Sequence, residues 1–282
     1  MARWRKLGLI AGGGALPMRI VAEREALGEP YHLVRIAGSA DEPLNAKPGD
    51  DCGLGECGKI LRRLREADCD AVCFAGIVRR PDFSSLKVDW RGAALMPKII
   101  AAAARGDGAI LDVIVETLEA ENFLVVGADE AVSGLRAPQG AFGGHHPSPE
   151  DIADIAKAAA LINAIGPYDV GQAAVVDAGH VLAIEAAEGT DLMLARCADL
   201  PGAPDRQRNG VLVKRPKPGQ ELRVDLPVIG PETVRRAVIA KLRGIAVEAG
   251  LSLVMNRDEA VALADEANLF LYGFTEADLN QQ

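Results

Sequence analysis

The feature that most constrains the fold is an alternation of short apolar runs with helical segments between residues 6 and 129. The apolar runs are KLGLIAG, YHLVRIAG, DAVCFAG and FLVVGAD, at residues 6–12, 31–38, 70–76 and 123–129. Helical spacing of apolar residues marks the segments 16–28 and 58–68, and residues 91–121 are expected to form one or two helices interrupted at 104–109. Residues 41–57 have the turn residues of a loop. Strands without polar alternation are typical of sheets covered on both faces, so the pattern predicts a parallel sheet between layers of helices.

The second half of the chain has a different pattern. Residues 135–150 are rich in glycine and proline, which predicts a linker, and the SPED sequence from Ser148 predicts the cap of a helix that begins near Pro149. Beyond it, residues 172–186 predict two strands joined at a hairpin-like break. Helices are expected near 190–198, 231–243 and 257–267, with strands at 252–256 and 267–273. We therefore expect two domains, at residues 1–134 and 151–282, with a linker at 135–150.

Composition limits the classes of function. The chain of 282 residues has a net charge of −9, which argues against a general nucleic-acid binder but leaves room for a local basic pocket for a phosphorylated ligand. Its five cysteines lack CxxC spacing and a matching histidine pattern, so they are interpreted as reduced thiols. Neither a membrane span nor a signal-peptide cleavage site is recognisable. We expect a cytoplasmic protein whose membrane contact, if any, is peripheral.

The sequence GLIAGGGALP, at residues 8–17, places three glycines between a predicted strand and a predicted helix. Backbone amides of such a turn, together with a helix N-terminus, are suited to bind an anion, so Gly12, Gly13 and Gly14 are candidate phosphate contacts. The dinucleotide fingerprint is incomplete, because position 17 is proline and no acidic residue ends the second strand, and no GK[ST] follows. We expect contact with a substrate phosphate or sugar; the alternative is a turn that only tightens strand–helix packing.

A second group of candidate residues follows the third predicted strand, in AGIVRRP at residues 75–81. Ligands of open parallel sheets bind beyond the carboxyl ends of the strands, which would place Gly76, Arg79 and Arg80 at the same edge as the opening glycines. Guanidinium groups match phosphate oxygens, so the two arginines suit a diphosphate. The alternative is a pair of solvated surface arginines.

The second half offers acids and lysines in two segments. The acids Glu185, Glu188 and Asp191 lie around Thr190, and Lys214, Lys217 and Asp225 follow downstream. Asp225 stands in the apolar segment VDLPVIG, where a buried carboxylate requires a partner or a metal ion. The alternative is a structural salt bridge to Lys214, Arg215 or Arg223. The inventory, rich in acids and poor in histidine, indicates metal-assisted attack of water rather than covalent catalysis.

Seven segments, in order along essentially the whole chain, resemble one family. They are GLIAGGGALP, AGIVRRP, GDGAILDVIVETLEAENF, GQAAVV, AIEAAEGTD, VLVKRPKPGQELRVDLPVIG and AGLSLVMN. The chain resembles the LpxI family of UDP-2,3-diacylglucosamine pyrophosphatases of lipid A biosynthesis, and alphaproteobacterial members in particular. The segment that contains His145 and His146 matches no pattern of the family, so no role is carried onto it.

The resemblance implies a fold and a reaction. The implied fold class is α/β, with a Rossmann-like N-terminal domain built on a parallel sheet and a distinct α/β C-terminal domain. The implied activity is Mg²⁺-dependent hydrolysis of UDP-2,3-diacylglucosamine to UMP and 2,3-diacylglucosamine 1-phosphate (lipid X), with water directed at the phosphorus nearest the sugar. A homodimer in peripheral contact with the inner membrane, and no nucleic-acid partner, complete the expectation.

The resemblance, joined to the residue patterns, gives the candidate site. Asp225 is the main catalytic candidate, as a metal ligand or as the group that orients water, and Glu188 and Asp191 are further candidates for the same cluster. Asp225 and Asp191 are the expected Mg²⁺ ligands. The expected substrate-binding residues are Gly12, Gly13, Gly14, Gly76, Arg79, Arg80, Gln172, Thr190 and Lys214. The alternative function is a nucleotide-sugar-binding or transferase protein that does not hydrolyse its ligand.

Overall fold

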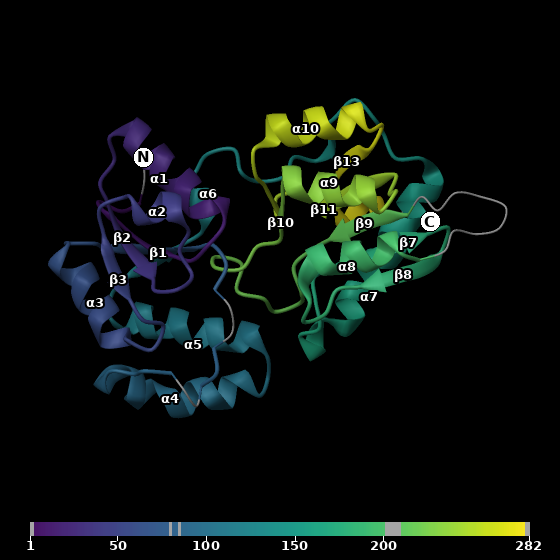
Figure 1. Cartoon of the computed structure of the whole chain (residues 1–282). Coiled ribbons are helices and arrows are strands. Elements are labelled where there is room, and N and C mark those ends of the chain that lie inside the picture. Colours follow the sequence, from purple (N-terminus) through teal and green to yellow (C-terminus); the bar gives the residue numbers. More distant parts are fainter. Residues whose placement is uncertain (1–2, 79–80, 84–85, 201–209, 280–282) are drawn as a thin grey trace. The chain divides into compact units, whose positions relative to one another are not determined.

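The structure is a computed structural model that describes residues 3–78, 81–83, 86–200 and 210–279. The chain divides into two compact units, residues 1–134 and 135–282 (Figure 1). Each unit has its own sheet and its own helices, so each is described by itself. No helix in the described ranges is both long enough and apolar enough to span a bilayer.

The first unit is built on a five-stranded sheet whose neighbouring strands are all parallel, in the order β3-β2-β1-β4-β5. Its strands are β1 (Leu7–Ala11), β2 (Tyr31–Ile36), β3 (Asp50–Cys52), β4 (Ala71–Ala75) and β5 (Leu124–Val126). The predicted parallel sheet is confirmed. The expectation of a loop throughout 41–57 is wrong, because β3 lies there. This edge strand has three residues, two of them aspartates, and so lacks the apolar run that marks a buried strand.

Helices cover both faces of this sheet. They are α1 (Ala15–Leu27), α2 (Glu42–Asn45), α3 (Cys57–Glu66), α4 (Trp90–Ala103), α5 (Asp107–Ala120) and α6 (Ala128–Ala131). Figure 1 shows α1, α2 and α6 on one side of the sheet and α3 and α5 on the other, with α4 packed outside them. Helix α1 ends at Gly28, whose left-handed backbone (φ 64°) closes the helix as the sequence predicts.

The second unit is built on a six-stranded mixed sheet in the order β6-β13-β11-β9-β7-β8. Its strands are β6 (Gly140–Ala141), β7 (Ala173–Asp177), β8 (His180–Ile184), β9 (Val211–Lys214), β11 (Gly244–Glu248) and β13 (Phe270–Phe274). A separate parallel pair consists of β10 (Val228–Ile229) and β12 (Leu253–Val254). Strands β9, β11 and β13 are parallel, whereas β7 runs antiparallel to β9 and forms the predicted hairpin with β8.

Two helical layers cover the second sheet. The helices are α7 (Pro149–Ile165), α8 (Gly189–Ala198), α9 (Pro231–Ile239), α10 (Arg257–Glu266) and α11 (Glu276–Leu279), and a 3-10 turn follows α7 at Gly166–Tyr168. Helix α7 packs on β7 and β9 with α11 beside it, and α8, α9 and α10 pack with one another over the other apolar core. The predicted cap of α7 is confirmed, because the side chains of Ser148 and Asp151 each accept a hydrogen bond from the other residue's backbone N–H.

Two features of the second unit differ from the pattern of the sequence. Strand β11 is central in the sheet, yet its sequence GIAVE directly follows the region expected to be a helix up to residue 243. The helix ends at Ile239, and the chain reverses through Lys241 (φ 56°) before β11 begins. Residues 135–150, expected to be a linker, are packed into this unit: Leu135 and Ala137 are buried, and β6 pairs with β13. Glycine and proline give this segment an irregular backbone, much of it exposed, and its apolar residues Leu135 and Ala137 are nevertheless buried.

Candidate functional site

The second unit brings several of the candidate residues to one edge of its sheet. Lys214 is the last residue of β9 and lies beside Ala173, the first residue of β7. Because β8 runs antiparallel to β7, the end of β8 and the start of β7 lie at this same edge. Gln172 and Glu185, which flank these two strands, are therefore placed next to Lys214 by the strand order itself.

A chain of hydrogen bonds connects these residues. The Lys214 ammonium donates from Nζ to Thr190 Oγ1 at 2.9 Å and to the backbone oxygen of Val228 at 3.1 Å. Thr190 Oγ1 donates to Glu185 Oε1 at 2.7 Å, and Glu185 Oε2 accepts from the backbone N–H of Gln172 at 2.9 Å. The hydroxyl of Thr190 thus joins a buried cation to a buried anion.

Burial sets the electrostatics of this cluster. Lys214 is 5% exposed and Glu185 is 7% exposed. Burial lowers the pKa of the Lys214 ammonium, and the carboxylates of Glu185, Asp191 and Asp225 oppose that shift. The pKa of Lys214 is nevertheless lower than usual, so the site holds a cation that has lost much of its hydration and faces three acids.

Asp225 lies in the loop between β9 and β10, and its carboxylate is the one in this cluster without a direct partner. Its backbone N–H donates to the Glu221 oxygen at 3.2 Å, and its backbone oxygen accepts from the Gln220 side chain. No hydrogen bond or ion pair joins its carboxylate to any residue within the described ranges. Burial raises the pKa of Asp225, and the charges of Lys217 and Lys214 oppose this rise.

The salt bridges expected as an alternative for Asp225 go elsewhere. Arg215 pairs with Glu248 at 3.0 Å and with Glu276 at 2.6 Å, on the opposite face of the sheet from Lys214. Arg223 pairs with Glu221 at 2.7 Å. Lys214 lies close enough to Asp225 to influence its pKa but donates its hydrogen bonds to the oxygens of Thr190 and Val228. A structural salt bridge therefore does not account for Asp225.

The two acids at the start of α8 have different surroundings. Asp191 is close enough to Lys214 to raise its pKa and also lies 3.3 Å from Arg236 Nε. Glu188 pairs with Arg196 at 2.9 Å, and its own backbone amide, followed by Arg196, lowers its pKa. The structure thus brings Asp191 to the cluster around Lys214 and holds Glu188 in a surface ion pair.

Gln172 contributes an acceptor as well as a backbone donor. Its side-chain oxygen Oε1 is buried and has no hydrogen-bond partner in the described part of the chain. A buried acceptor without a donor is costly, so such an atom indicates a position that a bound ligand completes. Glu185, Lys217 and Asp169 also surround Asp225 electrostatically; sequence reasoning noted the first two without assigning them a role, and Asp169 gave no signal.

The side chains around Asp225 determine whether a magnesium ion fits this site. No group of three or more His, Cys, Asp or Glu side chains within the described ranges is placed to hold a metal ion. Mg²⁺ does not require such a cage, because it is commonly held by one or two carboxylates with waters and substrate phosphates. The half-buried Asp225 carboxylate, which has no direct partner, fits that pattern, whereas Asp191 already faces Arg236.

The backbone amides of the glycine turn in the first unit donate hydrogen bonds to other parts of the protein. The N–H of Gly12 donates to the Ala75 oxygen at 2.9 Å, and that of Gly13 to the Ile77 oxygen at 3.0 Å. Gly14 donates to the Asp41 carboxylate at 2.5 Å. All three amides that were expected to face a phosphate therefore have protein partners, and a ligand contact at this turn stays a prediction.

Close approach of two turns explains why glycine is needed here. A Cβ on Gly12 would lie 2.4 Å from the Ile77 oxygen, and one on Gly76, which has φ 90°, would lie 2.5 Å from the Gly13 oxygen. Asp41, which lies beyond the end of β2, reaches this turn in the structure and accepts the Gly14 N–H. No feature of the sequence indicated this contact. Arg79 and Arg80 lie outside the described residues.

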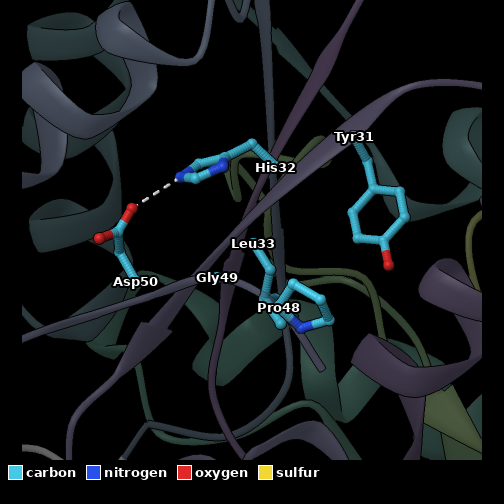
Figure 2. Close-up of a pocket in the computed structure, with 6 residues that line it drawn as sticks. All are labelled: Tyr31, His32, Leu33, Pro48, Gly49 and Asp50. Carbon is cyan, nitrogen blue, oxygen red and sulfur yellow. Dashed lines mark hydrogen bonds and ion pairs between the residues drawn. The ribbon is translucent and has the colours of Figure 1, made fainter. Parts of the chain in front are cut away.

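An open concavity in the first unit lies away from this turn. It is lined by Tyr31, His32, Leu33, Pro48, Gly49 and Asp50 (Figure 2). His32 Nε2 lies 3.0 Å from Asp50 Oδ2, as the dashed line in Figure 2 marks. These residues are at the amino ends of β2 and β3, whereas the glycine turn follows the carboxyl end of β1. The concavity and the predicted ligand edge are therefore different places.

Comparisons with known proteins identify the family. The model of the LpxI N-terminal domain matches residues 6–135, and that of the LpxI C-terminal domain matches residues 138–272. The chain belongs to the LpxI family. A curated relative, UDP-2,3-diacylglucosamine pyrophosphatase LpxI of Caulobacter vibrioides, is 50% identical over 272 residues, which cover 95% of this chain and 97% of that protein. The resemblance of the seven sequence segments to this family is thereby confirmed.

A solved structure also matches this chain, but its similarity is too low to support any conclusion about the fold or the function. It is a crystal structure of N5-carboxyaminoimidazole synthase from Aspergillus clavatus, 15% identical, with a TM-score of 0.22. The match covers 74% of this chain and 46% of that one. The two-domain α/β fold rests instead on the two LpxI domain models and on the sheets described above.

Proposed function

We propose that this LpxI family member hydrolyses the pyrophosphate bond of UDP-2,3-diacylglucosamine, with Mg²⁺, to give UMP and lipid X in lipid A biosynthesis. The observation that carries the proposal is 50% identity, over 95% of the chain, to a protein named for that pyrophosphatase activity. The cluster around Lys214 supports it with a buried cation and several acids at one edge of a sheet.

Lys214 is proposed to bind the diphosphate. Negative charge grows on the attacked and leaving phosphates during hydrolysis, and a cation in a water-poor site stabilises it more than a solvated one. The ammonium donates two of its three N–H bonds, to Thr190 and to the Val228 oxygen, and these two bonds hold it in place. Its third N–H is bonded to neither of these two oxygens. Glu185, fixed by Thr190 and Gln172, keeps the lysine charged before substrate enters.

Asp225 is proposed to orient the attacking water and to hold Mg²⁺. When bound, Mg²⁺ polarises a phosphoryl oxygen and neutralises developing charge. A carboxylate whose pKa is raised by burial is also a better proton acceptor than a solvated one, which suits it to a water aimed at phosphorus. Asp191 is a second proposed ligand, provided that it leaves Arg236.

Gln172 and the first unit are proposed to recognise the rest of the substrate. The unpartnered Gln172 Oε1 suits a donor such as a sugar hydroxyl or the uracil N–H. The turn residues Gly12, Gly13, Gly14 and Gly76, with Arg79 and Arg80, stay the proposed contacts of the first unit. At the turn, an incoming phosphate would compete with Asp41 for the Gly14 amide. Peripheral contact with the inner membrane is also part of the proposal, because the substrate is a lipid. The homodimer that the family resemblance implies is part of it as well.

The test is release of UMP from UDP-2,3-diacylglucosamine in H₂¹⁸O, with and without Mg²⁺. We expect UMP and ¹⁸O-labelled lipid X, and a decrease of at least about hundred-fold in kcat for Asp225→Asn with substrate still bound. Lys214→Met is expected to lower kcat/KM similarly. Glu259→Gln is the matched control, because Glu259 forms an exposed ion pair with Arg235 and belongs to none of the proposed sites, and it should keep a near-normal rate.

Two results would contradict the proposal. Binding of substrate without any release of UMP would favour the alternative of a nucleotide-sugar-binding protein. UMP formed only when an acceptor other than water is supplied, with no ¹⁸O in either product, would favour a transferase. A normal rate for Asp225→Asn would leave hydrolysis standing and remove the role assigned to that residue.

A further inference from the structure

The outward side of helix α4 is apolar, although it faces solvent in the first unit. Trp90 is 75% exposed and Ile100 is 53% exposed. The other exposed positions on the same helical face are Pro97 and the alanines at 93, 94, 101 and 104. The opposite side of the helix packs on α3 and α5, and Figure 1 shows α4 as the outer layer beside α5. Surface helices usually place their apolar residues inward, so this face requires an explanation.

The charges on the same helix have one sign. Between Asp89 and Asp107 the chain contains Arg91, Lys98 and Arg105 and no acidic residue, although the whole protein has a net charge of −9. Lys98 is exposed on one flank of the apolar face and Arg105 is exposed just beyond the end of the helix; neither has an ion-pair partner in the described ranges. Arg91 instead pairs with Glu121.

We propose that this face of α4 docks on the surface of an anionic phospholipid bilayer. The combination matches an interfacial helix: tryptophan prefers the level of the headgroups, small residues allow the helix to lie close to the surface, and cations on the flank bind lipid phosphates. This inference rests on the proposed function, because a substrate with two acyl chains must be taken from a membrane. A two-fold contact between copies through this face would bring the same cations together.

The experiment measures binding of the intact protein to vesicles in the absence of substrate. Flotation compares vesicles of phosphatidylethanolamine with phosphatidylglycerol against vesicles of phosphatidylcholine alone, at low and high salt. A parallel measurement uses the Trp4→Phe variant, in which Trp90 is the remaining tryptophan. We expect binding to the anionic vesicles that weakens with salt, together with a blue shift of Trp90 emission.

Two pairs of variants separate this face from general effects of charge and hydrophobicity. Lys98→Glu is compared with Lys241→Glu, an equal change of charge at an exposed position of the second unit. Ile100→Asp is compared with Ile239→Asp, at a residue that is 67% exposed. The α4 variants are expected to bind anionic vesicles about ten-fold more weakly or worse, and the controls to bind as the unchanged protein does.

Hydrolysis of detergent-dispersed substrate is measured on the same proteins. Normal UMP release by a protein that does not bind vesicles would overturn the docking proposal and leave the proposed function intact. Vesicle binding without UMP release would contradict the proposed function and leave the docking proposal standing. Equal loss in the Lys98 and Lys241 variants would also overturn the proposal. So would a change from dimer to monomer in Ile100→Asp without lipid, since that result would assign the face to a second copy.

Discussion

The hydroxyl of Thr190 makes a quantitative prediction, because one atom joins a buried cation to a buried anion. Thr190→Val keeps the shape of the side chain and removes both hydrogen bonds, at 2.9 Å to Lys214 and at 2.7 Å to Glu185. Hydrogen bonds to charged groups contribute about 1.5–3 kcal/mol each. Since Lys214 keeps the Val228 oxygen and Glu185 keeps the Gln172 amide, we expect the lower end of the sum, about 3 kcal/mol of unfolding free energy.

Urea unfolding followed by far-UV circular dichroism measures this loss in the second unit. Trp4 and Trp90, the two tryptophans, belong to the first unit, so their fluorescence monitors that unit in the same samples. The matched control is Thr275→Val, which removes a 2.8 Å hydrogen bond to the half-buried Asp278 and is expected to cost about 1 kcal/mol. A loss for Thr190→Val no larger than that of the control would refute the reasoning that burial makes this bridge strong.

Three further predictions concern other parts of the chain. Burial raises the pKa of Cys69 to about 11 and that of Cys73 to about 12, so their thiolate fractions at pH 8 fall by about a hundred-fold or more. Alkylation followed by mass spectrometry should therefore show slow labelling of both cysteines until the protein is unfolded. Gly76→Ala, with both a left-handed backbone and a 2.5 Å clash, should lower the melting temperature more than Gly28→Ala, which has the backbone strain alone, about 1 kcal/mol; equal shifts would mean that the clash is relieved. Asp154→Ala removes the acceptor of the hairpin amides at 178 and 179, at 2.8 and 2.7 Å, and should cost about 2–3 kcal/mol and speed hydrogen exchange at those two amides; unchanged exchange would contradict that role.

Features set by neighbouring residues were predictable. The apolar runs of β1, β4 and β5 needed no knowledge of their partners, since a strand buried on both faces is apolar throughout. The stop of α1 at Gly28 and the cap of α7 at Ser148 each depend on residues within one turn of helix. Strands β3 and β11 were not predicted. Strand β3 is a short polar strand at the edge of its sheet, and β11 directly follows a segment with a helical pattern.

The sequence predicted several residues of the candidate site but not which of them contact one another. The sequence indicated Lys214, Asp191 and Asp225 as a lysine and acids in apolar or glycine-containing segments, and the family resemblance added Thr190. It gave no means to separate Asp191 from Glu188, which stand on the same first turn of α8 and point to different partners. The contact of Asp41 with the glycine turn is likewise absent from any local pattern.

The sequence by itself determined two α/β domains, the LpxI family and the types of residue available for phosphate chemistry, because periodicity, caps and turns are local and the seven motif segments are specific. Only the tertiary structure decided which residues meet. The antiparallel β7–β8 hairpin beside β9 brings Gln172, Glu185 and Lys214 to one edge, although they are far apart along the chain. Burial at that edge then sets the charges, lowering the pKa of Lys214 and raising that of Asp225, since desolvation depends on what surrounds a side chain and not on its neighbours in sequence.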